Sequence, residues 1–248
     1  MLQGLARAPP RAPFSHEVAD VVEEFKPAIV SFHFGLPATD LLERVKSWGA
    51  RVLASATTVK EAQWLESHGA DGIIAQGLEA GGHRSIFLSD DLATQVGTFS
   101  LLPQIIQTVN VPVVAAGGIA DAAGVKAALS LGAIAVQVGT AYLLCSETKT
   151  SQIYRAAIKS EDAQHTAITN VFSGRPARSI VNRVIREIGP INCDAPAFPL
   201  AANAISCIRK QAEGDGSGDF TPLWCGQNSS GCKEISAAEL TRELAADL

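Results

Sequence analysis

Short apolar runs alternate with helical patterns over much of this chain, and that alternation limits it to few folds. The runs occupy residues 28–34, 51–55, 72–76, 111–116 and 133–138. They are nearly continuous in apolar residues, as expected for strands that are covered on both faces. Strands of this length that alternate with helices predict βα units and a parallel sheet, and therefore an α/β fold.

Capping residues mark the ends of the helices between these runs. The expected caps are Thr39, Thr58 and Asp121 at the N-termini, and Gly49, Gly69 and Gly132 at the C-termini. A side-chain oxygen at an N-cap accepts a hydrogen bond from the first turn, and glycine tolerates the left-handed conformation that ends a helix. About five βα units are therefore expected before residue 140.

The remainder of the chain has a more helical pattern. Helical periodicity covers residues 151–159, 179–187, 197–213 and 237–248. We expect a ragged N-terminal segment over residues 1–14 and one domain over residues 15–248. Within that domain, residues from about 150 to 200 are expected to form a helical lid or insert, and further helices follow it.

Composition narrows the classes of function. The net charge is −5 and there is no long basic run, so a nucleic-acid partner is not expected. No apolar stretch is long enough for a membrane span. The five cysteines are scattered without a C-x-x-C pair, which argues against a disulfide framework or a zinc site and favours a reducing compartment. No carboxylate–histidine spacing suggests a metal site.

The βα units fit either an open doubly wound sheet or part of a closed barrel. No G-x-G-x-x-G follows the first strand, which weakens the dinucleotide-binding alternative. Residues suited to chemistry cluster after the third, fourth and fifth strands. That clustering favours a barrel, whose active sites lie in the loops at the carboxyl ends of the strands.

A glycine-rich loop follows the third strand and presents a histidine. The strand ends at Gln76, and the loop passes Gly77, Gly81 and Gly82 before His83. Glycine allows a positive φ angle and a close approach of the backbone to a planar ligand. A histidine held there is suited to removing a proton near neutral pH. The alternative is a flexible turn with an exposed histidine, but the whole run at a strand end favours function.

Glycines also follow the next two strands. Gly117 and Gly118 end the fourth strand, and Gly139 and Thr140 end the fifth. Backbone N–H groups at such positions, beside a helix N-terminus, are suited to binding phosphate. Each glycine alone would be explained by a tight turn. Two successive units with the same arrangement favour a shared phosphate site.

Two further segments are candidates for ligand contact. His33 alternates with Ser31 at the end of the first strand, and it either lines the same pocket or is a core histidine. Arg175 and Arg178 lie between helical patterns, where they either contact an anionic substrate or are solvated loop residues.

Several runs of the sequence resemble the successive motifs of nitronate monooxygenases. They are SFHFGLP, ASATT, AQGLEAGGHRS, VPVVAAGGIAD, VQVGTAYLLCSE, NVFSGRPARS and PLWCGQ, between about residue 15 and residue 228. AGGH and AAGGIAD are the most specific, and FMN-type enoyl-acyl-carrier-protein reductases share them. The resemblance implies an incomplete TIM-type (β/α)8 barrel, with about five C-terminal βα units and extra C-terminal helices, that binds FMN non-covalently.

The resemblance also implies site residues. The positions that match flavin-binding positions of the family are Gln76, Gly81, Gly118, Gln137, Val138, Gly139 and Thr140. Gly117 and Gly118, together with Gly139 and Thr140, would hold the phosphate. His83 matches the catalytic base, which in the family sits over the flavin.

The chain departs from the family pattern at a few points. Ser85 and Ser179 replace glycines, which is expected to shift a loop at each position. Family members carry roughly a hundred further N-terminal residues with the first three barrel strands, and a barrel closes with eight. Five strands alone leave two open edges. The chain is therefore interpreted as a shortened product, an incomplete sequence or a half that needs a partner.

The implied activity is FMN-dependent oxidation of alkyl nitronates by O2 to a carbonyl compound and nitrite. Its partners would be a small nitronate or nitroalkane and O2, in the cytoplasm, and a homo-oligomer is left open. One alternative is an FMN-dependent enoyl-thioester reductase that uses NAD(P)H. The other is a non-catalytic, truncated remnant, which the missing strands motivate.

Overall fold

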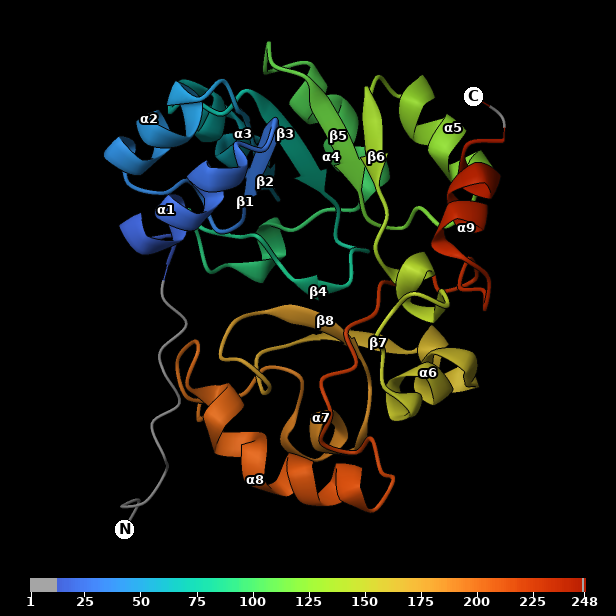
Figure 1. Cartoon of the computed structure of the whole chain (residues 1–248). Helices are drawn as coiled ribbons and strands as arrows, with labels where there is room; N and C mark the ends of the chain where they lie inside the picture. Colours follow the sequence, from blue (N-terminus) through green and yellow to red (C-terminus); the bar gives the residue numbers. More distant parts are fainter. Residues whose placement is uncertain (1–12, 247) are drawn as a thin grey trace.

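The computed structural model describes residues 13–246 and 248, and its first half is built on a parallel sheet (Figure 1). The strands are β1 (Ile29–Phe32), β2 (Arg51–Ala56), β3 (Gly72–Gln76), β5 (Val113–Ala116) and β6 (Ala135–Gln137). They pair in parallel in the order β1-β2-β3-β5-β6. This order follows the chain without reversal, as in a barrel, whereas a doubly wound sheet reverses at its switch point.

Helices connect the strands and cover the sheet. They are α1 (His16–Phe25), α2 (Thr39–Ser47), α3 (Val59–Ser67), α4 (Thr98–Ile106) and α5 (Ala122–Ser130). The predicted caps Thr58 and Asp121 accept hydrogen bonds from the N–H groups of Glu61 and Gly124. The predicted cap Thr39 was wrong, because α2 begins at Thr39 itself and no side chain caps it. Helix α1 was not predicted.

The main core lies between the sheet and its helices. Leu65, Leu101 and Ile105 from α3 and α4 pack against Ile73 of β3, and all four are almost completely buried. Several inward strand positions carry alanine, such as Ala54, which allows the helices to approach closely.

The edges of the sheet differ from its centre. Every residue of β3 is buried, whereas Ile29 of β1 is 58% exposed and Ile134, just before β6, is 65% exposed. Within the part of the chain that the structure describes, β1 and β6 each pair with one neighbour only. Because a barrel closes with eight strands, the sheet forms an open part of a barrel wall.

A second, antiparallel sheet packs against the carboxyl ends of the parallel strands (Figure 1). Its strands β4 (Gly82–His83), β8 (Ala177–Ile180) and β7 (Thr166–Thr169) pair in the order β4-β8-β7. Helices α6 (Gln152–Lys159), α7 (Arg183–Ile188) and α8 (Ala201–Gly214) lie around it, whereas α9 (Ala237–Leu244) packs beside α5 (Figure 1).

Residues 150–200 therefore contain two strands as well as helices. The helix expected over residues 179–187 was wrong in its first residues, because Ser179 and Ile180 belong to β8 and α7 begins at Arg183. All residues of β8 are buried, and its pairing with β7 outweighs the helical pattern of the sequence. Among the described residues, no helix is long and apolar enough to cross a membrane.

Candidate functional site

A cavity of about 420 Å³ lies at the carboxyl ends of β3, β5 and β6. Its size falls within the usual range of ligand pockets. Its lining includes Gln76, Gly81, Gly117, Gly118, Gln137, Val138, Gly139 and Thr140. The structure thus brings together every residue that was predicted to bind the cofactor. We call this space the main cavity.

Backbone amide groups point to a role for this cavity. The N–H groups of Gly118, Gly139 and Thr140 donate to no atom of the residues that the structure describes. Gly117 and Gly118 have φ angles of 111° and 76°, which L-residues rarely adopt. A Cβ atom added at Gly139 would meet nothing within 4 Å, so the cavity has room beside that backbone. Unpaired amides beside open space are suited to binding an anion.

Two buried arginines fix the loop after β3. Arg84, which is fully buried, donates to the carbonyl oxygens of Gln76 at 2.8 Å and Gly77 at 2.7 Å. Arg178 donates twice to the carbonyl oxygen of Leu78, at 2.8 and 3.0 Å. Burial, together with repulsion from Arg178, lowers the pKa of Arg84 to about 10, so it stays charged at neutral pH. Arg178 is thus neither a solvated residue nor a contact of the main cavity.

Glu79 lines the main cavity, but its carboxylate is hydrogen-bonded to Thr98. Its carboxylate accepts hydrogen bonds from the N–H group of Thr98 at 2.8 Å and from the Thr98 hydroxyl at 2.9 Å. Thr98 begins α4, so the carboxylate sits at the positive end of a helix. This arrangement weakens the repulsion between Glu79 and an anion bound nearby.

His83 lies at the border of the main cavity, not in its lining. Its ring Nε2 is 2.8 Å from the Ser173 hydroxyl oxygen, and its carbonyl oxygen accepts from Gln76 Nε2 at 3.0 Å. The His83 ring borders a second, smaller cavity of about 100 Å³, while Gly81 and Gly82 line the main cavity. We call this second space the side cavity.

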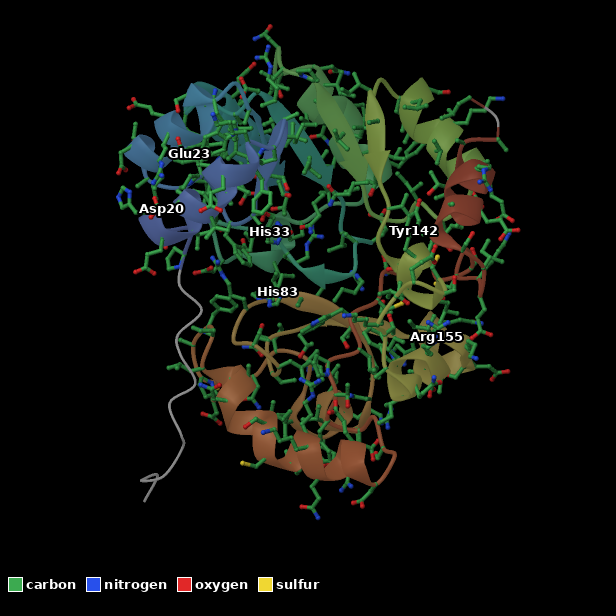
Figure 2. The ribbon with its side chains drawn as sticks, viewed as in Figure 1. Asp20, Glu23, His33, His83, Tyr142 and Arg155 are labelled. Carbon is green, nitrogen blue, oxygen red and sulfur yellow. The ribbon has the colours of Figure 1, made fainter. Side chains whose placement is uncertain are left out.

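Two residues that the sequence marked as candidates for ligand contact, His33 and Arg175, lie near His83. His33, from the end of β1, lines the main cavity, and Figure 2 shows it close to His83 between the two sheets. The His33 ring hydrogen-bonds to the His83 backbone. Partial burial and the charges of Arg175 and Arg84 lower the pKa of His33 from its usual 6.5. The Arg175 guanidinium stacks 4.0 Å from the centre of the Phe34 ring and lines neither cavity.

The two serines that depart from the family pattern are buried and hydrogen-bonded. The Ser85 hydroxyl donates to the Ser55 carbonyl oxygen at 3.1 Å and accepts from the Phe34 N–H group at 3.2 Å. The Ser179 hydroxyl accepts from the Leu223 N–H group at 3.1 Å. Each serine therefore ties two segments together, which a glycine could not do.

Several residues near the C-terminus line the main cavity and were not predicted. The Gly226 N–H group donates to the Thr140 hydroxyl at 2.9 Å, and Asn228 Nδ2 donates to the Gly118 carbonyl oxygen at 3.0 Å. Trp224 lines both cavities, and the Tyr154 hydroxyl donates to its carbonyl oxygen. The PLWCGQ motif marked this segment in the sequence, but no spacing rule placed it beside the glycines.

Comparison with known proteins decides the family. The nitronate monooxygenase family model matches residues 6–247. The chain belongs to the nitronate monooxygenase family.

Individual members of the nitronate monooxygenase family are clearly similar to this chain. A nitronate monooxygenase of Paraburkholderia phytofirmans is 43% identical over 227 residues, which are 91% of this chain and 62% of the relative. A nitronate monooxygenase of Pseudomonas aeruginosa is 42% identical, covering 91% of this chain and 64% of the relative. The chain thus spans somewhat less than two thirds of the length of these relatives.

Solved structures agree with the fold. Nitroalkane oxidase from Streptomyces ansochromogenes matches with a TM-score of 0.87 and 39% identity, over 94% of this chain and 67% of that chain. FabK from Thermotoga maritima matches with a TM-score of 0.75 and 29% identity, over 95% and 72%. The predicted incomplete TIM-type (β/α)8 barrel is thereby confirmed.

Proposed function

We propose that this chain binds FMN in the main cavity and serves the oxidation of alkyl nitronates by O2 to a carbonyl compound and nitrite. The observation that carries the proposal is the set of unpaired N–H groups at two neighbouring strand ends, Gly118 and Gly139, beside the loop that carries His83. The named activities of the similar nitronate monooxygenases support the same assignment.

The residues of the main cavity fit FMN. The N–H groups of Gly118, Gly139 and Thr140 would hold the phosphate, since they donate to no described atom and Gly139 and Thr140 lie at the start of a 3-10 helical turn. Gln76 and Gly81 would border the flavin ring, together with Gln137 and Val138. FMN, when bound, supplies the redox chemistry, and the protein supplies position and electrostatics.

The part of His83 in this proposal is to handle a proton. The ring nitrogen of His83 that carries no hydrogen would take the α-proton of a neutral nitroalkane, or the ring would hold the nitronate anion that results. The Ser173 hydroxyl, 2.8 Å from Nε2, orients the ring. Around it, the rings of Phe34, Phe198 and Trp224 lie with their centres between 5.3 and 6.0 Å from the imidazole and exclude water.

The first experiment measures flavin and nitrite. Purified chain is incubated with FMN, passed through a desalting column and examined for flavin absorbance. It is then supplied with ethyl nitronate and O2, and nitrite release is measured. Flavin retention with nitrite formation is the expected result. Protein that stays colourless with excess FMN would overturn the proposal and favour a non-catalytic remnant.

The likeness to FabK favours one second candidate, an FMN-dependent enoyl-thioester reductase. Anaerobic addition of NADH or NADPH to the flavin-loaded chain separates the two. A reductase would bleach the flavin absorbance rapidly with one of the two nucleotides. A nitronate-oxidising chain would show bleaching with ethyl nitronate and little with either nucleotide.

A further inference from the structure

Thr98 contacts the glycines of the main cavity from outside that cavity. It is the first residue of α4, and it is not among the residues that line the main cavity. Its hydroxyl oxygen lies 2.9 Å from the Gly117 carbonyl oxygen and 2.9 Å from Glu79 Oε2. Thr98 therefore links the start of a helix to the glycine turn after β5.

The contact between Thr98 and Gly117 sets the direction of one peptide group. The Gly117 carbonyl and the Gly118 N–H belong to the same peptide unit, and in a trans peptide they point in opposite directions. The one cis peptide bond among the described residues joins Phe198 and Pro199, so this unit is trans. Because the Gly117 carbonyl is held from outside the main cavity, the Gly118 N–H turns towards the cavity, where it donates to no described atom.

This peptide group needs a partner to fix its direction because glycine lies on both sides of it. Gly117 and Gly118 have φ angles of 111° and 76°, and glycine has more backbone freedom than any other residue. Rotation of the peptide unit would direct a carbonyl oxygen, instead of an N–H group, at an anion in the main cavity. The hydroxyl that fixes the Gly117 carbonyl therefore decides whether this turn attracts or repels a phosphate.

Glu79 keeps Thr98 in place. The two oxygens of its carboxylate accept the Thr98 N–H group, at 2.8 and 3.0 Å. The Thr98 hydroxyl has a single hydrogen, which it shares between the Glu79 carboxylate and the Gly117 carbonyl. A Cβ atom at Gly77 would lie 1.9 Å from Thr98 Oγ1, and one at Gly97 would lie 2.7 Å from Glu79 Oε1. Glycine at both positions therefore allows the glutamate and the threonine to meet.

We propose that Thr98, held by Glu79, is a positioning residue that makes the main cavity select a phosphorylated flavin. This inference rests on the proposed function, which it deepens by naming a residue outside the cavity that sets the preference for FMN over riboflavin, the same flavin without its phosphate. Loss of the hydroxyl frees the peptide unit between Gly117 and Gly118 to rotate. The grip on the phosphate then weakens, while the contacts of the flavin ring do not change.

Titration with the two flavins tests the proposal. Thr98→Val replaces the hydroxyl by a methyl group of similar size and keeps the N–H group that donates to Glu79. The Kd for FMN should rise about tenfold, near the upper end of what one hydrogen bond contributes, while the Kd for riboflavin stays within about twofold. Thr98→Ser keeps the hydroxyl and should restore the preference for FMN. An equal loss of affinity for both flavins in Thr98→Val would show a merely structural role and overturn the proposal.

Thr221→Val is the matched control. Thr221 is buried, its hydroxyl donates to the Glu213 carboxylate at 2.9 Å, and it does not line the main cavity. Both valine variants lose a hydrogen bond between a threonine and a glutamate, so both should lower Tm by a similar amount. Only Thr98→Val should change the ratio of the Kd values for riboflavin and FMN. The same change of that ratio in both variants would contradict the proposal.

Glu79→Gln tests the sharing of the hydroxyl hydrogen. The amide keeps an oxygen for the Thr98 N–H group and places an amide N–H beside the Thr98 hydroxyl, so the hydroxyl donates to the Gly117 carbonyl alone. Affinity for FMN should rise, partly because a negative charge is removed from the cavity lining. The gain should be at least about twofold larger in the unaltered background than beside Thr98→Val, which has no hydroxyl hydrogen to redirect. Equal gains in the two backgrounds would overturn the proposal.

Inorganic phosphate separates this proposal from the proposed function. Phosphate, compared with chloride at the same ionic strength, should raise the Tm of the flavin-free protein, and Thr98→Val should reduce that rise while Thr221→Val keeps it. Such a result without flavin binding would keep the role of Thr98 and reject the activity. Flavin binding and nitrite release with the same flavin preference in both valine variants would reject the role of Thr98 and keep the activity. An unaltered protein that responds to neither phosphate nor FMN would overturn both.

Discussion

The main cavity and the side cavity meet at one short loop but are built from different material. The main cavity is walled by backbone at the ends of β3, β5 and β6, with glycines at the closest points. The side cavity is walled by the rings of Phe172, Phe198 and Trp224. Backbone amides suit a phosphate, and aromatic rings suit a small apolar molecule. The two cavities share Trp224 as a wall and yet differ in the kind of molecule that they suit.

The largest expected effect is on the residue between the two cavities. His83→Asn should keep FMN bound, because the His83 ring borders only the side cavity. Turnover of neutral nitroalkanes should fall by roughly 10²- to 10⁴-fold, the usual contribution of a general base. Flavin absorbance and nitrite release are the two measurements. Full retention of activity on nitroethane would remove the base from the mechanism, and ethyl nitronate serves as the substrate control.

Substitutions at two glycines of the main cavity separate an effect on folding stability from an effect on FMN affinity. Gly139→Ala adds a methyl group that meets nothing in the protein, so Tm should not change while FMN affinity falls about tenfold or more. Gly117→Ala should lower both, because its φ angle is 111° and its Cβ would lie 3.0 Å from the Ala80 nitrogen. Flavin titration and thermal unfolding check the pair. Unchanged FMN affinity in both variants would place the phosphate elsewhere.

A smaller effect is expected at Ser173. Ser173→Ala removes the hydroxyl beside His83 Nε2 and should cost about 0.5–1.5 kcal/mol in stability. If the same bond contributes about 1 kcal/mol in the transition state, its loss should lower turnover about fivefold and shift the pH profile, since a tenfold change corresponds to about 1.4 kcal/mol. FMN content should stay the same. Ser173→Thr keeps the hydroxyl and should restore the pH profile, whereas a merely structural role would leave that profile unmoved in both variants.

The smallest effect concerns His33. Its pKa in the folded protein is lowered from 6.5, so the unfolded chain binds the proton more readily. Stability is therefore lost as the pH falls through about 6.5 towards the folded pKa. The ring is partly buried, but the residue as a whole still has much of its surface in contact with solvent, which screens the effect and keeps it small. His33→Gln should reduce the fall in Tm between pH 7.5 and pH 5.5, and an unchanged fall would show that other groups dominate.

The parallel half was predictable from sequence because its signals are local. The apolar runs, the glycine ends and the caps Thr58 and Asp121 depend on residues a few positions apart. The carboxyl ends of parallel strands meet at one edge, so the glycines after β5 and β6 had to converge.

The antiparallel half was less predictable because its stability comes from distant partners. Strand β4 has two residues and exists only by pairing with β8, so no periodicity marks it. Asn228 reaches Gly118 across 110 positions of sequence. Arg178 was expected to be a solvated loop residue or a ligand contact, yet it donates to the Leu78 carbonyl oxygen. The similar role of Arg84, which donates to the Gln76 carbonyl oxygen, was not predicted.

The two guanidinium groups have a consequence for the order in which the molecule assembles. The Leu78 carbonyl oxygen gains its hydrogen bonds only after Arg178, which follows it by 100 residues in the chain, has been synthesised. The parallel strands leave the ribosome well before β8 does. During that interval the loop after β3 lacks the hydrogen bonds from Arg178. Capture of the cofactor should therefore be a late event, completed only when the last third of the polypeptide has been synthesised and has folded back.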